Sequence, residues 1–170
     1  MPVRVRPITL WRAEGDNQPG VLAQTLEPLA AAGADLQVVM GYRLPGDRAR
    51  AAIEIFPVTG ARALSASQAA GLSEAAISAV HVEGNNRPGL GHAIAKALAD
   101  AGINIDFFLA QVSGRRHTTV IGFDSREDAD RAIPLIKGTA APPRRPAARK
   151  AASKGTRATK RARKAARRRR

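Results

Sequence analysis

Nearly the same phrase occurs twice in this chain, as GDNQPGV at residues 15–21 and as GNNRPGL at residues 84–90. When residues 10–36 are aligned without gaps with residues 79–105, nine of the 27 positions are identical. A repeat of this length indicates that one supersecondary unit is built twice along the chain. The 170 residues can hold two such small domains, so we expect a fold with two similar halves.

The local patterns predict the same order of elements in both copies. β-rich segments at 8–11 and 77–82 lead into the two phrases, and apolar residues at helical spacing follow each phrase. Further strands are predicted at 36–44, 51–56, 103–112 and 118–123, and second helices at 61–75 and 125–137, the latter with Ser125 as its N-cap. The repeated order strand, helix, strand, strand, helix predicts an α+β fold. It leaves the last strand of the first copy unplaced, because 77–82 must open the second copy.

The repeated phrase is also the strongest candidate for a binding site. A strand that ends in Gly-Asx-Asn at a helix start presents free backbone N–H groups to a carboxylate or another anion. Gly20 and Gly89 leave this approach open, and Asn17 and Asn86 each add a donor and an acceptor. The structural alternative is that each Asn caps a helix, while the Pro-Gly pair shapes the turn with Pro in the first helical turn.

The segment 84–105, GNNRPGLGHAIAKALADAGINI, resembles the ACT domain, a module that regulates many enzymes of amino-acid metabolism. The resemblance covers about residues 7–138 and therefore both copies. It implies two ferredoxin-like βαββ(α)(β) domains, at residues 1–75 and 76–139, packed as an intrachain pair. We expect the pair to form sheet edge to sheet edge, because this would cover strands that are otherwise prone to association.

The resemblance also implies a ligand site. ACT domains typically bind an amino acid between the first strand–helix loop of one domain and the second strand of a paired domain. Carried over to this sequence, the ligand-binding residues are Asn17, Gly20, Asp35, Asn86, Arg87, Pro88, Gly89, Leu90 and Asn104. Members that bind serine have a His where this chain has Gly84, so their serine site is incomplete here. Asp35 replaces Asn104 in the first copy, and we expect the second copy to be the better binder.

The last thirty residues differ in kind from the rest. Residues 141–170 contain fourteen Lys and Arg and no Asp or Glu, so residues 1–140 hold 28 − 14 = 14 cations against 14 carboxylates. Alanine is the only apolar residue there apart from proline and one glycine, so nothing offsets the entropy of ordering, and we predict disorder over residues 140–170. The composition resembles the tails of linker histones and of bacterial histone-like proteins.

Such a polycation binds nucleic acid by releasing counterions, without reading its sequence. A solubility tail, or an anchor to acidic proteins or anionic lipid, is the alternative. The predicted nucleic-acid contacts are Arg144, Arg145, Arg149, Lys150, Lys154, Arg157, Lys160, Arg161, Arg163, Lys164, Arg167, Arg168, Arg169 and Arg170.

Catalytic patterns are missing from the sequence. His81, His92 and His117 share no metal-ligand spacing with a carboxylate, and we interpret each as a solvated or helix-end histidine. The chain has no cysteine, no serine elbow motif and no phosphate-binding glycine pattern. We therefore predict a protein that is not an enzyme and needs no metal or cofactor. No apolar run approaches the ~18 residues of a membrane span, so we expect a cytoplasmic location, including the nucleoid.

Together these patterns predict a small-molecule, amino-acid-binding regulatory protein whose tail tethers it to nucleic acid or to an acidic partner. We also expect that it can form a homodimer. The alternative is a nucleic-acid-associated architectural protein in which the ACT pair is only a dimerisation scaffold.

Overall fold

The computed structural model describes residues 3–140. The nucleic-acid contacts predicted between residues 144 and 170, and the disorder predicted there, lie outside the described residues. The first unit contains β2 (Trp11–Asp16), α1 (Val21–Ala31), β3 (Val38–Arg43), β4 (Arg50–Phe56), α2 (Ala61–Ala69) and β5 (Ser73–Glu74). The second unit contains β6 (Ser78–Asn85), α3 (Leu90–Asp100), β7 (Phe107–Ser113), β8 (Arg116–Phe123) and α4 (Arg126–Ala140), together with β1 (Arg4–Ile8). The predicted α+β class with two βαββ units is confirmed.

The N-terminal strand β1 belongs to the sheet of the second unit. It pairs antiparallel with β6, from Arg4 opposite Glu83 to Ile8 opposite Ala79, and the sheet order is β1-β6-β8-β7. The other sheet has the order β3-β4-β2-β5, so the short strand β5 is the last strand of the first unit. The predicted first domain, residues 1–75, thus includes a strand that hydrogen-bonds in the sheet of the other unit.

The prediction of a single strand at residues 8–11 is wrong, because β1 ends and β2 begins within these residues. Residues 9 and 10 separate β1 from β2, and these two strands enter different sheets. Leu10 is fully buried in the apolar cluster between the sheets. The side chain of Leu10 therefore anchors the crossing segment to the core, while Thr9 beside it is exposed.

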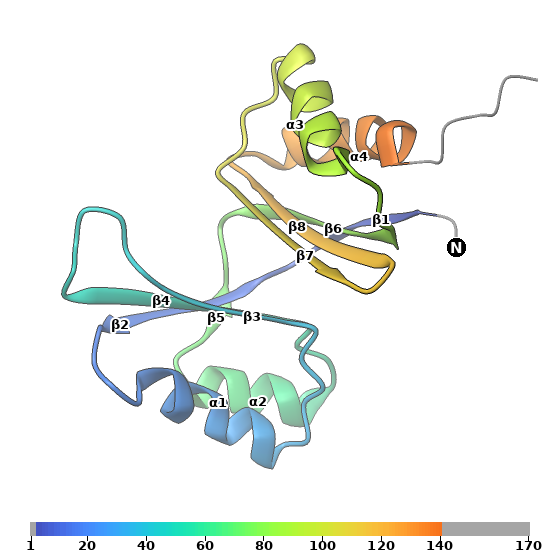
Figure 1. Ribbon diagram of the computed structural model, residues 1–170. Helices are drawn as coiled ribbons and strands as arrows, with labels where there is room; N and C mark the ends of the chain where they lie inside the picture. Colours follow the sequence, from blue (N-terminus) through green and yellow to red (C-terminus); the bar gives the residue numbers. More distant parts are fainter. Residues whose placement is uncertain (1–2, 141–170) are drawn as a thin grey trace, which may run out of the picture.

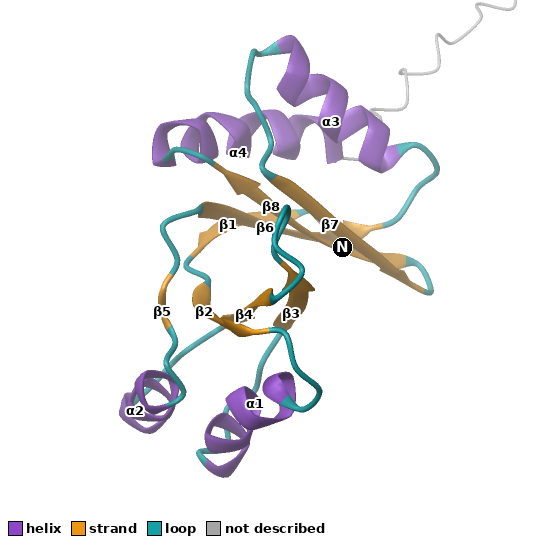
Figure 2. Ribbon diagram, turned by 90° about the vertical axis from the view of Figure 1, so that its left-hand side faces the viewer, coloured by secondary structure: helices purple, strands orange, loops and turns teal. Residues whose placement is uncertain are grey.

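The two sheets pack face to face, with α3 and α4 outside one sheet and α1 and α2 outside the other (Figures 1 and 2). The predicted edge-to-edge pairing is therefore wrong, since within residues 3–140 no strand of one sheet pairs with a strand of the other. The inner faces carry apolar side chains from both units, and edge pairing would leave this surface in water. The buried members of this cluster are Ile8, Leu10, Val38, Ala79 and Val120.

Candidate functional site

Glycine opens both helices that follow the repeated phrases. Gly20 has φ = +95° and Gly89 has φ = +75°, a left-handed conformation that other residues rarely adopt. α1 and α3 begin at the next residue, so Pro19 and Pro88 precede the helices instead of lying in their first turns. Leu90, a predicted ligand residue, is buried in the core of the second unit. Its side chain anchors the loop to the core, and Asn86, Pro88 and Gly89 before it are exposed.

The asparagines of the two loops make different contacts. Asn17 donates from its Nδ2 to the carbonyl oxygen of Arg48 at 3.0 Å, which ties its loop to the β3–β4 hairpin. Both loops are also tied by the backbone, since Asn17 N–H donates to the carbonyl oxygen of Ala49 at 2.7 Å and Asn86 N–H to that of Arg115 at 2.8 Å. Neither side chain caps the helix that follows. The exposed Asn86 amide has no hydrogen-bond partner within residues 3–140.

Arg87 is held by the end of α4. Its Nη2 donates to the carbonyl oxygen of Thr139 at 2.9 Å, and its side chain is half-buried. A cation at a helix C-terminus is favourable, because the carbonyl groups there carry partial negative charge. Arg87 therefore links the second loop to the last turn of α4 through one of the five N–H donors of its guanidinium.

Asn104 lies far from the loop of its own unit. Asn85, at the loop, is opposite Arg116 at the start of β8. Asp106 N–H, close to Asn104, instead bonds to the carbonyl oxygen of Gly122 near the end of β8. β8 is eight residues long, so at ~3.4 Å per residue these two positions are about 20 Å apart.

The first unit has the same separation. Asn17 N–H bonds to the carbonyl oxygen of Ala49, just before β4, while Gln37 N–H bonds to that of Phe56 at its end. Asp35 lies beside Gln37 and so at the far end of the sheet from its loop. Neither unit brings its loop and its second-strand residue together within one chain.

One outer strand of each sheet, β3 in the first unit and β7 in the second, carries exposed apolar side chains. Neither strand has a neighbour on its outer side in the part of the chain that the structure describes. The large exposed apolar residues of the two strands are Val39, Tyr42, Phe108, Leu109 and Val112. Each unit thus has an open edge beside its repeated loop.

In each unit a large side chain covers a glycine where the edge strand meets the first helix, but the helix supplies the large side chain in the first unit and the strand supplies it in the second. In the first unit Leu22 of α1 covers Gly41 of β3, with its Cδ atoms 3.7 Å from where a Cβ would be. In the second unit Phe108 of β7 instead covers Gly91 of α3, which occupies the position of Leu22 in the repeat, at 4.0 Å. This exchange was not predicted, although the alignment of Leu22 with Gly91 in the repeat is a signal of it.

Gly84, where the resemblance to serine-binding ACT domains would place a histidine, is closely packed. A Cβ at this position would lie 2.7 Å from Cγ2 of Val3 and 3.1 Å from Cε1 of His117. The N-terminal segment therefore fills the space that a side chain would need. The second loop does not contain the histidine of serine-binding members, and its packing leaves no room for one.

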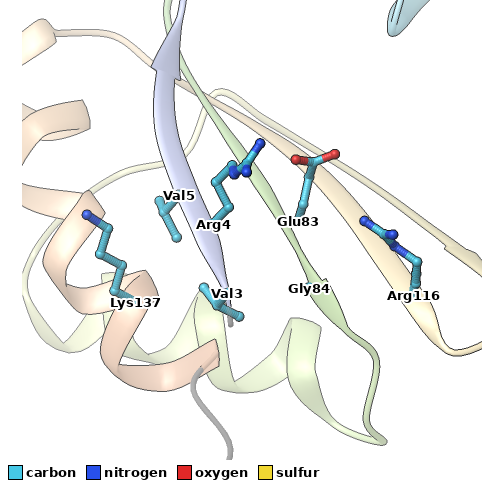
Figure 3. Close-up of a pocket in the computed structure, with 7 residues that line it drawn as sticks. All are labelled: Val3, Arg4, Val5, Glu83, Gly84, Arg116 and Lys137. Carbon is cyan, nitrogen blue, oxygen red and sulfur yellow. The ribbon is translucent and has the colours of Figure 1, made fainter. Parts of the chain in front are cut away.

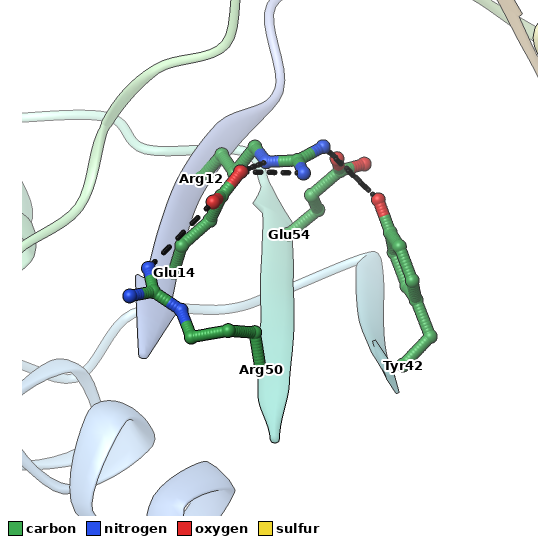
Figure 4. A network of polar contacts seen from close by, with 5 residues as sticks. All are labelled: Arg12, Glu14, Tyr42, Arg50 and Glu54. Atoms are coloured by element: carbon green, nitrogen blue, oxygen red, sulfur yellow. Dashed lines mark hydrogen bonds and ion pairs between the residues drawn. The ribbon is translucent and has the colours of Figure 1, made fainter. Parts of the chain in front are cut away.

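A polar network on the inner face of the first sheet was not predicted (Figure 4). Arg12 pairs through Nη1 with Glu54 Oε1 at 2.8 Å and through Nη2 with Glu14 Oε1 at 2.6 Å. Tyr42 OH donates to the same oxygen of Glu54 at 2.9 Å. Burial is the main cause and the contacts with Glu54 are the second cause that raise the pKa of Tyr42 to about 12. Glu54 is only 1% exposed, so this network holds a buried carboxylate between the sheets.

Two of the three histidines are buried, so the interpretation of each as solvated or helix-end is wrong for His81 and His117. His81 lies on the inner face, where its ring is 6.2 Å from that of Phe56 and burial lowers its pKa. Sheet stacking, which the sequence did not predict, covers this side chain. His92 is exposed in the first turn of α3.

Within residues 3–140, no three His, Cys, Asp or Glu side chains come together in a way that could hold a metal ion. Across the same residues, no helix combines the length and apolar character needed to cross a membrane.

No protein-family model matches the chain, and no curated protein sequence matches it. Among solved structures, it is similar to protein BT0572 of Bacteroides thetaiotaomicron, with a TM-score of 0.65 and 15% identity over 81% of this chain and 91% of that one. It is also similar to the ligand-free regulatory subunit of aspartate kinase from Thermus thermophilus, with a TM-score of 0.55 and 20% identity over 82% and 97% of the two chains. The corresponding subunit from Thermus flavus gives a TM-score of 0.51 at the same identity and coverage. At these identities the likeness shows a shared fold.

Proposed function

We propose that this protein is a non-enzymatic, amino-acid-binding regulatory protein whose binding site is completed by a second chain. The observation that carries the proposal is the position of the second loop, where the exposed amide of Asn86 lies at one end of an open edge strand and Asn104 lies near the other. The shared fold with two aspartate kinase regulatory subunits supports a regulatory role. The resemblance of the loop to ACT domains supports an amino acid as ligand.

Antiparallel pairing of β7 with β7 of a second copy would bring the two residues together. In such a pair the start of one strand lies beside the end of the other. Asn104 of one chain would then approach the Asn86 loop of its partner, and the twofold symmetry would create two equivalent sites. The exposed apolar side chains of β7 would be covered at the same time, which favours association.

Calorimetric titration of the full chain with each of the common amino acids tests this function. We expect one amino acid to bind, and we expect Asn86→Ala and Asn104→Ala each to abolish its binding. Gln68→Ala removes an exposed amide from α2, far from both positions, and serves as the matched control. Failure of every amino acid to bind the wild-type chain would exclude the sensor.

Mixing the two variants tests whether the site is shared between chains. In a dimer of one Asn86→Ala chain and one Asn104→Ala chain, one site has both substitutions and the other has neither. Random mixing of equal amounts therefore restores about one quarter of the wild-type sites. If both variants are folded and dimeric and their mixture recovers no binding, Asn86 and Asn104 do not act across a two-chain interface.

A second candidate function is binding to nucleic acid through residues 141–170. The observation that favours it is the sequence of this segment, with fourteen cations and no carboxylate. Its affinity for duplex DNA should fall steeply between 50 and 200 mM salt, and deletion of residues 141–170 should weaken it by about 10-fold or more. Unchanged affinity after the deletion would contradict this function and the architectural alternative alike. Both roles are compatible with a cytoplasmic location, including the nucleoid.

A further inference from the structure

Charges in the second unit are separated toward its two ends. The end that carries the repeated loop, the β7–β8 hairpin and the C-terminus of α4 has the cations Arg4, Arg87, Arg115, Arg116 and Lys137. Glu83 is the only carboxylate of the second unit at this end. The other six lie toward the opposite end: Asp100, Asp106, Asp124, Glu127, Asp128 and Asp130.

Cations near the acidic end form ion pairs, whereas within residues 3–140 the exposed cations at the basic end do not. The cations of α3 and α4 that lie near the acidic end are each paired within their helix. These pairs are Lys96–Asp100, Arg126–Asp130 and Arg131–Asp128. At the basic end, Arg4, Arg116 and Lys137 are exposed, and none of them makes an ion pair with a carboxylate of residues 3–140.

These three cations line a hollow of about 600 Å³ at the N-terminal end of β1 (Figure 3). Its other lining residues are Val3, Val5, Glu83 and Gly84. Glu83 lies directly across from Arg4 in the strand register, and Figure 3 shows its carboxylate between Arg4 and Arg116. The hollow therefore has three positive charges against one negative charge. It contains no aromatic side chain on which a base could stack.

We propose that this basic end is a folded docking surface for the phosphate backbone of duplex DNA. Guanidinium groups bind phosphate oxygens in a bidentate manner, and an ammonium adds a compact charge. Contacts to phosphates position a protein on DNA without reading its sequence, which fits a hollow with no side chain for base recognition. Within the described residues, the lining of the hollow contains no exposed large apolar side chain that could enter a lipid surface, and Val112, which is exposed near the end of β7, lies outside this lining.

The position of α4 connects this surface with the remaining chain. Arg87 bonds to Thr139 in the last turn of α4, so residue 141 follows from the basic end itself. The described part ends at the C-terminus of α4, near Lys137, and the sequence continues with fourteen cations in residues 141–170. A polyanion bound by that segment is therefore within reach of Arg4, Arg116 and Lys137. The surface belongs to the folded part, and its contribution is separable from that of the segment.

Salt titration of the full chain on a 30-base-pair DNA of mixed sequence tests the proposal by fluorescence anisotropy. Each phosphate contact contributes about 0.9 to the slope of log affinity against log salt concentration. The variant Arg4→Gln/Arg116→Gln/Lys137→Gln should therefore make this negative slope less steep, by about 2 to 3. The control Arg43→Gln/Arg48→Gln/Arg62→Gln removes the same charge from exposed sites of the first unit, and its slope should stay as in the wild type.

Glu83→Gln supplies a test of opposite sign, because removal of the only carboxylate in the hollow should strengthen DNA binding. Equal slopes in the two triple variants would overturn the proposal, since only net charge would then matter. The same conclusion follows if the basic-end variant loses affinity for phosphatidylserine vesicles while its DNA binding is unchanged. Circular dichroism of each variant checks that it is folded, and Arg116→Gln alone should still lower the slope by about 1.

Discussion

Replacing Arg12 by Met removes the cation that compensates Glu54 but keeps most of the apolar stem. Glu54 is 1% exposed, and its only polar partners within residues 3–140 are Arg12 and Tyr42. Removing one partner of a buried ion pair typically costs 3–5 kcal/mol, because the other charge stays buried without compensation. Arg12 is itself 28% exposed and partly screened by water, so we expect the low end, about 3 kcal/mol.

Urea unfolding followed by circular dichroism measures this loss, with Arg50→Met as the matched control. Arg50 belongs to the same network but lies 3.8 Å from Glu14, and both side chains are about 40% exposed. Its removal should cost less than about 0.5 kcal/mol. The double variant Arg12→Met/Glu54→Leu should recover more than half of the loss, because it leaves no unpaired charge. Equal costs for Arg12→Met and Arg50→Met, or additive costs in the double variant, would refute the reasoning.

Three further measurements follow from single side chains. The chain has one tyrosine, so the pH-dependent absorbance of tyrosinate reports on Tyr42 alone. The midpoint of this titration should be about 12 in the native protein and ~10 in urea, with stability lost as pH rises between these values. Burial lowers the pKa of His81, so as the pH falls this histidine is protonated in the unfolded chain before it is protonated in the native protein. Stability should therefore fall from pH 7.5 to 5.5. His81→Leu should reduce this fall, and parallel curves of stability against pH for the two proteins would contradict the assignment. Arg87→Met should cost about 1 kcal/mol in urea unfolding and increase amide exchange in the last turn of α4, and an unchanged exchange rate would show that the contact with Thr139 does not hold that turn.

The repeated phrases predicted the two units because their signals are local. Strand, loop and helix periodicity, glycine after a helix and Ser125 before α4 are properties of a few neighbouring residues. Asp128 N–H donates to Ser125 Oγ at 3.0 Å, so the predicted N-cap is confirmed. Asn86 of the second loop is exposed, and its contact with a ligand stays a prediction.

The candidate site was less predictable, since its geometry depends on distant parts of the chain. Nothing in the loop indicated that Arg87 would bond to α4, fifty-two residues later in the sequence. The resemblance to ACT domains implied a ligand site with both Asn86 and Asn104, but within one unit the length of β8 separates them. Whether two such residues meet depends on which strand edges remain open, and an edge is defined only after the whole sheet has formed.

The sequence by itself determined the α+β class, the two-copy architecture and the separation of a neutral body from a basic segment, because periodicity, turn residues and charge can be read locally. The tertiary structure alone decided that β1 joins the far unit, that the sheets stack face to face, and that His81 and Glu54 are buried. Backbone hydrogen bonds offer every sheet edge the same donors and acceptors, so strand exchange leaves little local trace. Side-chain burial between the sheets, which depends on both units at once, selects the arrangement.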